Sequence, residues 1–348
     1  MSKLNRLLGS LFLSATLLSA GAARAADITG AGATFPYPAY VKWGESYKSQ
    51  TGMGLNYQPI GSGNGIKQIQ SNTVDFGATD IPLSQSELGI AGLVQFPVMI
   101  GGVVPVVNIA GIAPGQLKLD GKVLADIYLG KITRWNDARI AADNAGLALP
   151  NEAIRVLYRS DVSGTSYIFT KYLSQVNTEW MRNFGTGSAL NWPVGTGGKG
   201  NEGVTSYVQR INYSIGYVEY AYALQNSLAY IRLKNRDGQF VKPEAASFQS
   251  AVANATWNLE YGFPETATNE PGKDSWPITG VTFALMHKTP SKPGNAIEAL
   301  KFFDWVLTHG SGIASEMQYV TLPPNIQTMV RDVWKTQIKS AAGVPLWK

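Results

Sequence analysis

The stretch LVQFPVMIGGVVPVVNIAGI, from Leu93 to Ile112, determines how this 348-residue chain is divided, because it holds no charged residue across twenty positions. Its length alone meets the criterion for a membrane span. Its prolines and glycines, however, are too closely spaced for a continuous helix, and its paired valines favour extended backbone. We therefore predict a buried strand that crosses from one domain to another, and not a membrane helix.

A second apolar run, WPITGVTFALM from Trp276 to Met286, predicts a strand that runs back. With two such crossings, the first domain is discontinuous. We expect one lobe to combine residues 26–100 with 280–348, and residues 101–279 to form a second lobe inserted between them. Movement between the lobes would then hinge near residues 101–109 and 278–286.

Strand-like and helix-like runs alternate in both halves, which is typical of α/β proteins. Strands are expected at 55–60, 74–78 and 154–158, and helices at 36–50, 66–71 and 167–175. Residues 326–338 keep apolar side chains at helical spacing, which predicts another helix. We expect a further helix at 295–308, with Gly310 at its C-terminal cap. The sequence therefore predicts an α/β fold.

Residues 1–25 have the features of a cleaved secretory signal. Lys3 and Arg6 precede a short apolar run, and Ala23-Arg24-Ala25 matches the small-x-small cleavage pattern. Cleavage would lower the formal net charge from +5 to +2, because three basic residues and no acidic ones are lost. The chain has no cysteine for a lipid anchor. We expect a soluble, monomeric periplasmic protein that neither spans the membrane nor binds nucleic acid.

Three segments place glycine and hydroxyl residues between a predicted strand and a predicted helix. They are GAGATFP at 30–36, GSGNG at 61–65 and RSDVSGTS at 159–166. The first turn of a helix leaves backbone N–H groups unpaired and carries partial positive charge, which suits a small oxyanion. For any single segment, helix capping and turn formation are the favoured explanation. Because all three share this chemistry, we expect them to converge on one anion.

The candidate donors are hydroxyl groups, backbone N–H groups and one forked guanidinium. They belong to Thr34, Phe35, Ser62, Arg159, Ser163, Gly164 and Thr165.

Motifs for cofactors and metals are incomplete. GAG at 30–32 has Phe35 where a dinucleotide fingerprint needs its third glycine, and GGKG at 197–200 lacks the hydroxyl residue that follows the lysine of a phosphate-binding loop. Neither of the two histidines, His287 and His309, lies in a metal-type or triad-type cluster. We expect no cofactor, no metal and no catalytic residue.

Asp80 follows the predicted strand at 74–79, at the edge of the sheet where loops gather. It could cap the turn at 83–88, or it could select between anions. Near neutral pH phosphate keeps at least one proton, which a buried carboxylate can accept in a hydrogen bond worth about 1.5–3 kcal/mol. Sulfate keeps none and would meet only like charge, at a cost of several kcal/mol more.

The strings GAGATFP (30–36), VDFGATDIPLS (74–84) and SGTSYIFT (163–170) resemble the periplasmic phosphate-binding proteins of high-affinity phosphate ABC transporters. The similarity extends to FPVMIGGVVPVVNI, DIYLGKITRW, NWPVGTGGKGNEGV, IGYVEYAYA and ALKFFDW, so it covers nearly the whole mature chain. The resemblance implies a two-lobed type II periplasmic-binding-protein fold. In that fold each lobe is a sheet flanked by helices, two crossover strands join the lobes, and phosphate lies in the cleft between them.

The resemblance also implies what the chain does. A member of this family binds inorganic phosphate with selectivity over sulfate, has no enzymatic activity, and delivers its ligand transiently to an inner-membrane ABC permease. The donors named above, together with Asp80, correspond to the family's phosphate-binding positions. Asp161 corresponds to an acid that pairs with the arginine. The chain departs from the family at Val162, where glycine is frequent, and at Gly63-Asn64, where Ser-Gly is common.

Three alternatives remain at this point: a binder of another oxyanion such as sulfate or molybdate, a hydrolase of phosphate esters, and an adhesion protein of the cell envelope. The resemblance favours phosphate binding, with an open form of the free protein and a closed form of the complex.

Overall fold

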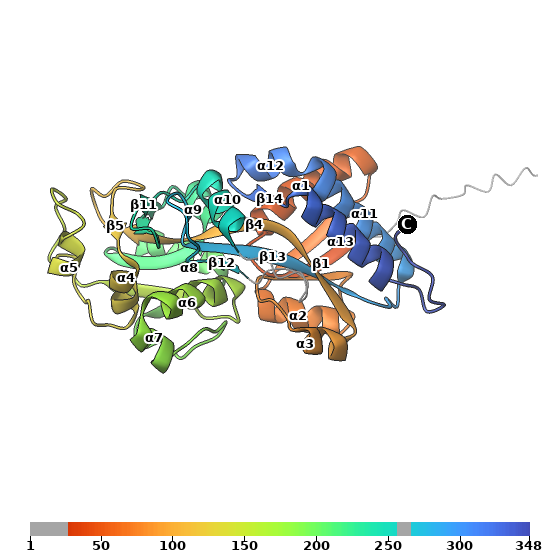
Figure 1. Cartoon of the computed structure of the whole chain (residues 1–348), viewed down its shortest axis with the longest axis horizontal. Coiled ribbons are helices and arrows are strands. Elements are labelled where there is room, and N and C mark those ends of the chain that lie inside the picture. Colours follow the sequence, from red (N-terminus) through yellow and green to blue (C-terminus); the bar gives the residue numbers. More distant parts are fainter. Residues whose placement is uncertain (1–26, 256–265) are drawn as a thin grey trace, which may run out of the picture.

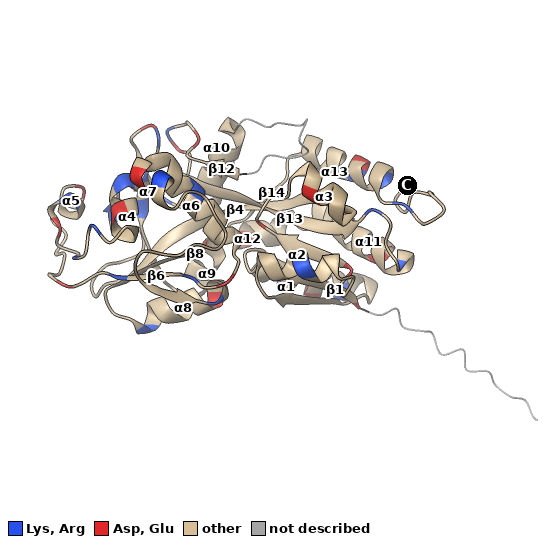
Figure 2. Ribbon diagram, turned by 90° about the horizontal axis from the view of Figure 1, so that it is seen from below, with Lys and Arg blue, Asp and Glu red and all other residues tan. Residues whose placement is uncertain are grey.

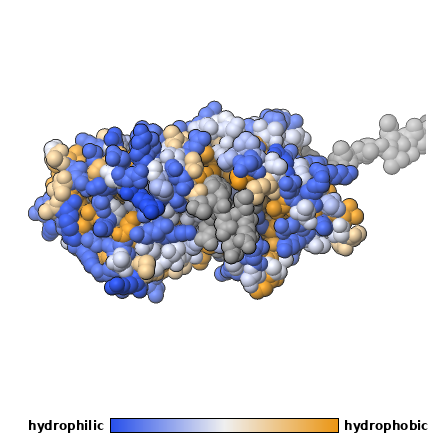
Figure 3. Space-filling model, in the orientation of Figure 1, coloured by the Kyte–Doolittle hydropathy of each residue, from blue (hydrophilic) through white to orange (hydrophobic). Residues whose placement is uncertain are grey.

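A computed structural model of the chain describes residues 27–255 and 266–348. The expected signal segment, residues 1–25, lies outside the described residues. Two lobes lie side by side, and the longest strands run between them (Figure 1). No helix in the described ranges is long and apolar enough to cross a membrane. The face shown in Figure 3 is mainly hydrophilic with small separate apolar patches, and Figure 2 shows acidic and basic residues interspersed over both lobes.

The two crossing strands are β4 (Leu93–Asn108) and β13 (Ile278–His287), which are antiparallel. From Leu93 to Gly102, β4 pairs with β13, and from Val103 onward it pairs with β8 (Ser214–Glu219). Its residues are nearly all buried, so the prediction of a buried crossing strand is confirmed. A Cβ on Gly102, at the change of partner, would lie 2.2 Å from the Phe248 ring. Glycine therefore lets the neighbouring layer approach there.

The strand order of the main sheet is β2-β1-β3-β13-β4-β8-β6-β7. In one lobe β1 is parallel to β2 and β3, and in the other β6 is parallel to β7 and β8. These strands are β1 (Ile28–Gly32), β2 (Leu55–Pro59), β3 (Phe76–Thr79), β6 (Arg155–Arg159) and β7 (Thr196–Gly198). Short strands pair with β4 or β13, namely β9 (Ala229–Tyr230), β12 (Thr266–Thr268) and β14 (Val320–Thr321). A small separate sheet contains β5 (Lys118–Leu119), β10 (Arg232–Lys234) and β11 (Phe240–Val241).

Helices cover both faces of the sheet in each lobe (Figure 1). Around the lobe of β1 lie α1 (Tyr37–Thr51), α2 (Ser62–Gln70), α3 (Gln85–Ala91), α11 (Pro293–His309), α12 (Ser311–Glu316) and α13 (Pro324–Gln337). The other helices are α4 (Gly121–Tyr128), α5 (Ala138–Ala141), α6 (Gly164–Val176), α7 (Thr178–Asn183), α8 (Gly200–Arg210), α9 (Tyr220–Gln225) and α10 (Ala245–Asn254). The predicted α/β fold is confirmed.

Two helices begin earlier than the sequence predicts, α2 at Ser62 instead of 66 and α6 at Gly164 instead of 167. Glycine has low helix propensity, but packing overrides it here. A Cβ on Gly65 would lie 2.4 Å from the Gly32 Cα, so only glycine lets α2 lie this close to β1. The glycine-rich segment is therefore itself the first turn of the helix.

Gly310 follows α11 as predicted, but its role is different. Its φ is −77°, so the residue is not a left-handed cap. The Trp43 Nε1 donates to the Gly310 carbonyl at 2.9 Å, and a Cβ on Gly310 would lie 2.8 Å from that nitrogen. Close contact between α1 and the α11–α12 junction, and not helix termination, requires glycine here.

Candidate anion-binding site

The three glycine–hydroxyl segments meet between the two lobes. Each connects a strand to the first turn of a helix: β1 to α1, β2 to α2, and β6 to α6. The predicted site side chains are at most 3% exposed, and they are Thr34, Phe35, Ser62, Asp80, Arg159, Ser163 and Thr165. Residues far apart in sequence therefore lie in one buried region, and their binding of one anion stays a prediction.

The start of α2 lies directly against the start of α6. The Ser62 Oγ accepts hydrogen bonds from the Gly164 N–H at 3.1 Å and from the Asp80 N–H at 3.3 Å. The Gly63 N–H donates to the Val162 carbonyl at 3.1 Å. A Cβ on Gly164 would lie 2.5 Å from the Asp80 Cβ, so this close approach needs glycine. These contacts join the two lobes, and the structure is thus a closed arrangement.

Arg159 lies at the end of β6 with its guanidinium paired to Asp161. Its Nε donates to Asp161 Oδ1 at 2.8 Å and its Nη2 to Oδ2 at 2.6 Å, while Nη1 donates to the Thr165 Oγ1 at 3.2 Å. Burial raises the pKa of Asp161, but Arg159 and the Gly200 N–H outweigh burial and hold that pKa below its usual value. Asp161 is therefore ionised and neutralises part of the Arg159 charge.

Asp80, unlike Asp161, forms no ion pair with Arg159 within the described ranges, and burial dominates its environment. It is 1% exposed, and its Oδ1 has no hydrogen-bond partner among the described residues. Burial raises the pKa of Asp80 to about 7, against the Thr282 and Ser62 hydroxyls and the Arg159 charge, which lower it. The capping alternative for Asp80 is wrong, because the Ser84 side chain caps α3 in a capping box with Glu87. Next to Ser62 and Gly164, Asp80 thus keeps one buried carboxylate oxygen without a partner in the described part of the chain.

Several donors of the predicted set are free to bind an anion. Within residues 27–255 and 266–348, the N–H groups of Thr34, Phe35 and Thr165 donate to no protein atom. Two N–H groups are already engaged, since that of Ser163 donates to the Ser188 carbonyl at 2.9 Å and that of Gly164 to Ser62. At position 163 the hydroxyl is therefore the available donor.

Sequence reasoning missed Asn201, which joins the two lobes at the site. Its Nδ2 and backbone N–H donate to the Thr34 Oγ1 at 2.8 and 3.2 Å, and its Nδ2 also lies 3.5 Å from the Thr165 Oγ1. Asn201 belongs to the first turn of α8, directly after the GGKG segment at 197–200. The GGKG segment does not match a nucleotide-binding motif. Like the three glycine–hydroxyl segments, however, it places glycines between a strand and a helix, and this pattern could have identified it.

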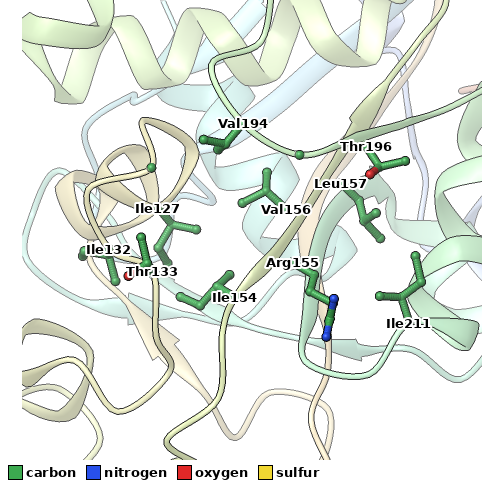
Figure 4. A pocket seen from close by; sticks show the side chains of 12 residues that line it. Ile127, Ile132, Thr133, Ile154, Arg155, Val156, Leu157, Val194, Thr196 and Ile211 are labelled. Atoms are coloured by element: carbon green, nitrogen blue, oxygen red, sulfur yellow. The ribbon is translucent and has the colours of Figure 1, made fainter.

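Other groups that could take part in chemistry are the metal-type side chains, the two histidines and a separate cavity. No group of three or more His, Asp or Glu side chains could hold a metal ion in that part of the chain. His287 contacts the Ile69 carbonyl and His309 stacks on Trp305. The side chains around a separate cavity of about 350 Å³ near β6 are mostly apolar, and Arg155 lies at its edge (Figure 4). None of the predicted donors lines that cavity.

The fold and the buried anion-type site define a two-lobed solute-binding protein, and residues 19–309 match the PBP superfamily domain. Along its whole length the chain is 51% identical to the phosphate-binding protein PstS of Pasteurella multocida (strain Pm70), with both chains fully covered. It is 50% identical to PstS of Haemophilus influenzae over 317 residues, which cover 91% of this chain and 95% of that one. The chain therefore belongs to the PstS family of phosphate-binding proteins.

A solved structure shares the fold. The phosphate-binding protein from Stenotrophomonas maltophilia matches with a TM-score of 0.67 and 20% identity, over 92% of this chain and 96% of that one. The expectation of a two-lobed periplasmic-binding-protein fold is thus confirmed. The relatives named here are binding proteins, the class that the sequence predicted in place of an enzyme.

Proposed function

We propose that this chain binds inorganic phosphate between its lobes and delivers it to an ABC permease of the inner membrane. The relatives that match its whole length are phosphate-binding proteins. The single observation that carries the proposal is the buried Asp80 Oδ1, which has no protein partner in the described ranges, on a residue that contacts Ser62 and Gly164 of the predicted donor set. A ligand with acceptor oxygens and one proton can accept hydrogen bonds from the N–H and hydroxyl donors and donate one to Asp80.

In this proposal Thr34, Phe35, Ser62, Arg159, Ser163 and Thr165 donate to phosphate oxygens, and Asp80 accepts the phosphate proton. The Gly164 N–H, which bonds to the Ser62 Oγ in this structure, changes its acceptor to a phosphate oxygen when the ligand binds. Asp161 limits the charge of Arg159, so binding depends on many oriented dipoles and not on net positive charge. Sulfate has no proton for Asp80 and would leave its carboxylate desolvated beside a dianion. This asymmetry argues against the sulfate and molybdate alternative.

Movement of the lobes is part of the proposal. We assign residues 26–100 and 280–348 to one lobe and 101–279 to the other, with hinges near 101–109 and 278–286. The change of partner along β4 after Gly102 supports this division. Since the site residues are almost fully buried in the closed arrangement, phosphate needs an open form to enter.

The proposed setting is the periplasm, reached through removal of residues 1–25, with a monomer that contacts its permease transiently. The basic residues, short apolar run and small-x-small pattern of residues 1–25 support this setting.

Isothermal titration of the mature chain with phosphate, arsenate and sulfate tests the proposal. We expect phosphate to bind tightly, arsenate to compete because it also keeps a proton, and sulfate to bind weakly. Small-angle scattering should show compaction when phosphate is added. Equal affinity for sulfate, turnover of a phosphate ester, or no heat with phosphate would overturn the proposal.

A further inference from the structure

Three consecutive carbonyl groups in the segment after β1 each accept a hydrogen bond from a tyrosine hydroxyl. Tyr57 donates to the Ala33 carbonyl at 2.7 Å. Tyr222 donates to the Thr34 carbonyl at 2.8 Å, and Tyr319 to the Phe35 carbonyl at 2.8 Å. The three tyrosines come from β2, from α9 and from the connection between α12 and β14. Three separate parts of the fold therefore hold this one turn.

The first two of these carbonyls belong to peptide groups whose N–H groups are among the predicted anion donors. A peptide group joins one residue's carbonyl to the next residue's N–H, so the Ala33 carbonyl is coupled to the Thr34 N–H, and the Thr34 carbonyl to the Phe35 N–H. Neither N–H has a protein acceptor among the described residues. A hydrogen bond to a carbonyl polarises its peptide group and makes the N–H a stronger donor.

The third carbonyl differs in one useful respect. The Phe35 carbonyl is joined to the nitrogen of Pro36, which has no hydrogen. Tyr319 can therefore hold the turn in place but cannot strengthen a donor, and its hydroxyl also lies 2.7 Å from the Oε2 of the buried Glu219. Tyr57 and Tyr222 can both fix and polarise a peptide group that has an N–H, whereas Tyr319 can only fix one. Comparing the three tyrosines therefore separates the two effects.

We propose that Tyr57 and Tyr222 are positioning residues for anion binding, whose hydroxyls hold and polarise the two peptide groups that donate the Thr34 and Phe35 N–H bonds to phosphate. This inference rests on the proposed function. It adds two residues that support the phosphate donors without contacting phosphate themselves.

Tyr57 and Tyr222 act at different stages. Tyr57 lies on β2 opposite Gly30 of β1, in the same lobe as Thr34, so its bond does not require closure. Tyr222 lies on α9, whose neighbour β8 belongs to the other side of the β4 change of partner. Its bond to Thr34 forms across the lobes, beside the bonds from Asn201 to the Thr34 hydroxyl. Tyr57 therefore prepares its donor in advance, and Tyr222 strengthens its donor on closure.

The Tyr222 hydroxyl also has a competing acceptor. It lies 2.8 Å from the Glu202 Oε1 as well as 2.8 Å from the Thr34 carbonyl, and a hydroxyl has one hydrogen to donate. Glu202 is exposed, and the Tyr222 hydrogen is shared between its carboxylate and the Thr34 carbonyl, which weakens the bond to Thr34. In Glu202→Gln the side-chain amide can instead donate to the tyrosine oxygen, which leaves the hydroxyl hydrogen for the Thr34 carbonyl.

The test combines phosphate titration with NMR of the Thr34 and Phe35 amides in the phosphate complex. Tyr57→Phe and Tyr222→Phe should each weaken phosphate binding about 3- to 10-fold, as expected for the loss of one hydrogen bond. Tyr57→Phe should move the Thr34 amide proton upfield, and Tyr222→Phe the Phe35 amide proton. Glu202→Gln should move the Phe35 amide proton downfield. Tyr319→Phe should weaken binding less and spare both amide signals.

Tyr172→Phe is the matched control, because Tyr172 is a buried tyrosine of α6 whose hydroxyl has no partner in the described part of the chain. It should bind phosphate as the wild type does. In the wild-type complex, both amides should show scalar coupling to the phosphorus across the hydrogen bond, a readout that needs no variant to fold. Absence of both couplings, or Tyr57→Phe and Tyr222→Phe variants with unchanged amide shifts, would overturn the inference. A wild type that binds no phosphate would instead refute the proposed function.

Discussion

The two lobes each bring one acidic side chain to the site, and the two acids have opposite environments. In the lobe of β3, Asp80 is buried with one oxygen lacking any partner among the described residues, and burial raises its pKa to about 7. In the lobe of β6, Asp161 has both oxygens bonded to Arg159, and its pKa is held below the usual value despite burial. Asp80 therefore has an oxygen available to a ligand, whereas both oxygens of Asp161 are bonded to Arg159.

The difference shows that residue type alone does not decide what an acid does at an anion site. Asp161 lets a buried guanidinium be present without an excess of positive charge. Asp80 places an acceptor where a second negative charge would be repelled. Changes to either acid or to its partners should therefore have different effects on phosphate binding.

Arg159→Ala should weaken phosphate binding most, by about 30-fold or more, since losing one partner of a buried charge pair costs about 2–5 kcal/mol. It removes the forked donor and leaves Asp161 as an unneutralised negative charge. Calorimetry measures the affinity, with Arg155→Ala at the exposed start of β6 as the matched control. A double-mutant cycle with Asp161→Ala should be non-additive, and additive losses would contradict the pairing.

Asp80→Asn should weaken phosphate binding and reduce the phosphate-to-sulfate affinity ratio by about 10- to 100-fold, in line with about 1.5–3 kcal/mol for a hydrogen bond to a charged group. The amide can donate to sulfate, which meets only like charge in the wild type. Titrations with both anions measure the ratio. Glu45→Gln removes the same charge from an exposed position of α1 and should leave the ratio unchanged. A wild-type ratio in Asp80→Asn would remove Asp80 from its proposed role.

The two departures from the family pattern lie against each other across the lobes, and they offer a test of closure. A Cβ on Gly63 would lie 2.5 Å from the Val162 Cβ. Gly63→Ser should therefore hinder closure and weaken phosphate binding about 5- to 50-fold, because overpacking costs about 1–3 kcal/mol. Val162→Gly in the same chain should restore the affinity. Calorimetry and small-angle scattering measure the two effects, and failure of the rescue would show that the residues act separately.

The pH dependence of stability should distinguish the two acids. The folded pKa of Asp80 lies above its ordinary value of 3.8, so the native state binds more protons than the unfolded state between about pH 4 and pH 7. Asp80 therefore lowers the free energy of unfolding as pH rises through this window, by at most about 1.4 kcal/mol per pH unit. Asp161 has a lowered pKa, and its contribution is instead lost only as pH falls below about 4.

Urea unfolding of the phosphate-free protein from pH 5 to pH 8 measures this effect. The wild type should lose stability relative to Asp80→Asn as pH rises. Parallel pH profiles of the two proteins would mean that Asp80 is not buried as an unpaired acid.

Much of the site was predictable because helix starts have local signals. Glycine and hydroxyl residues between a strand and a helix identified the segments at 30–36, 61–65 and 159–166, and the structure brings all three together. The crossing strand at Leu93–Asn108 was predictable from its lack of charge and its prolines. The starts of α2 and α6 were placed too late, because glycine in a first turn is tolerated for packing that no local pattern reveals.

The residues that sequence reasoning missed are those whose role depends on distant partners. Asn201 reaches Thr34 across 167 positions of sequence, Tyr222 reaches it across 188, and Tyr319 reaches Phe35 across 284. A lone tyrosine in an apolar helix is usually a core residue. No spacing distinguishes one whose hydroxyl holds a particular carbonyl.

The sequence was enough to indicate the helix starts that supply unpaired N–H groups, because helix starts and turns follow from a few neighbouring residues, but not that the Ser163 and Gly164 N–H groups are bonded within the fold. It also determined the family, through long strings of matching residues. Tertiary structure alone decided that Asp80 would be the unpaired acid and Asp161 the paired one. Burial and charge pairing depend on elements that are far apart along the chain, and the fold sets the distances between them.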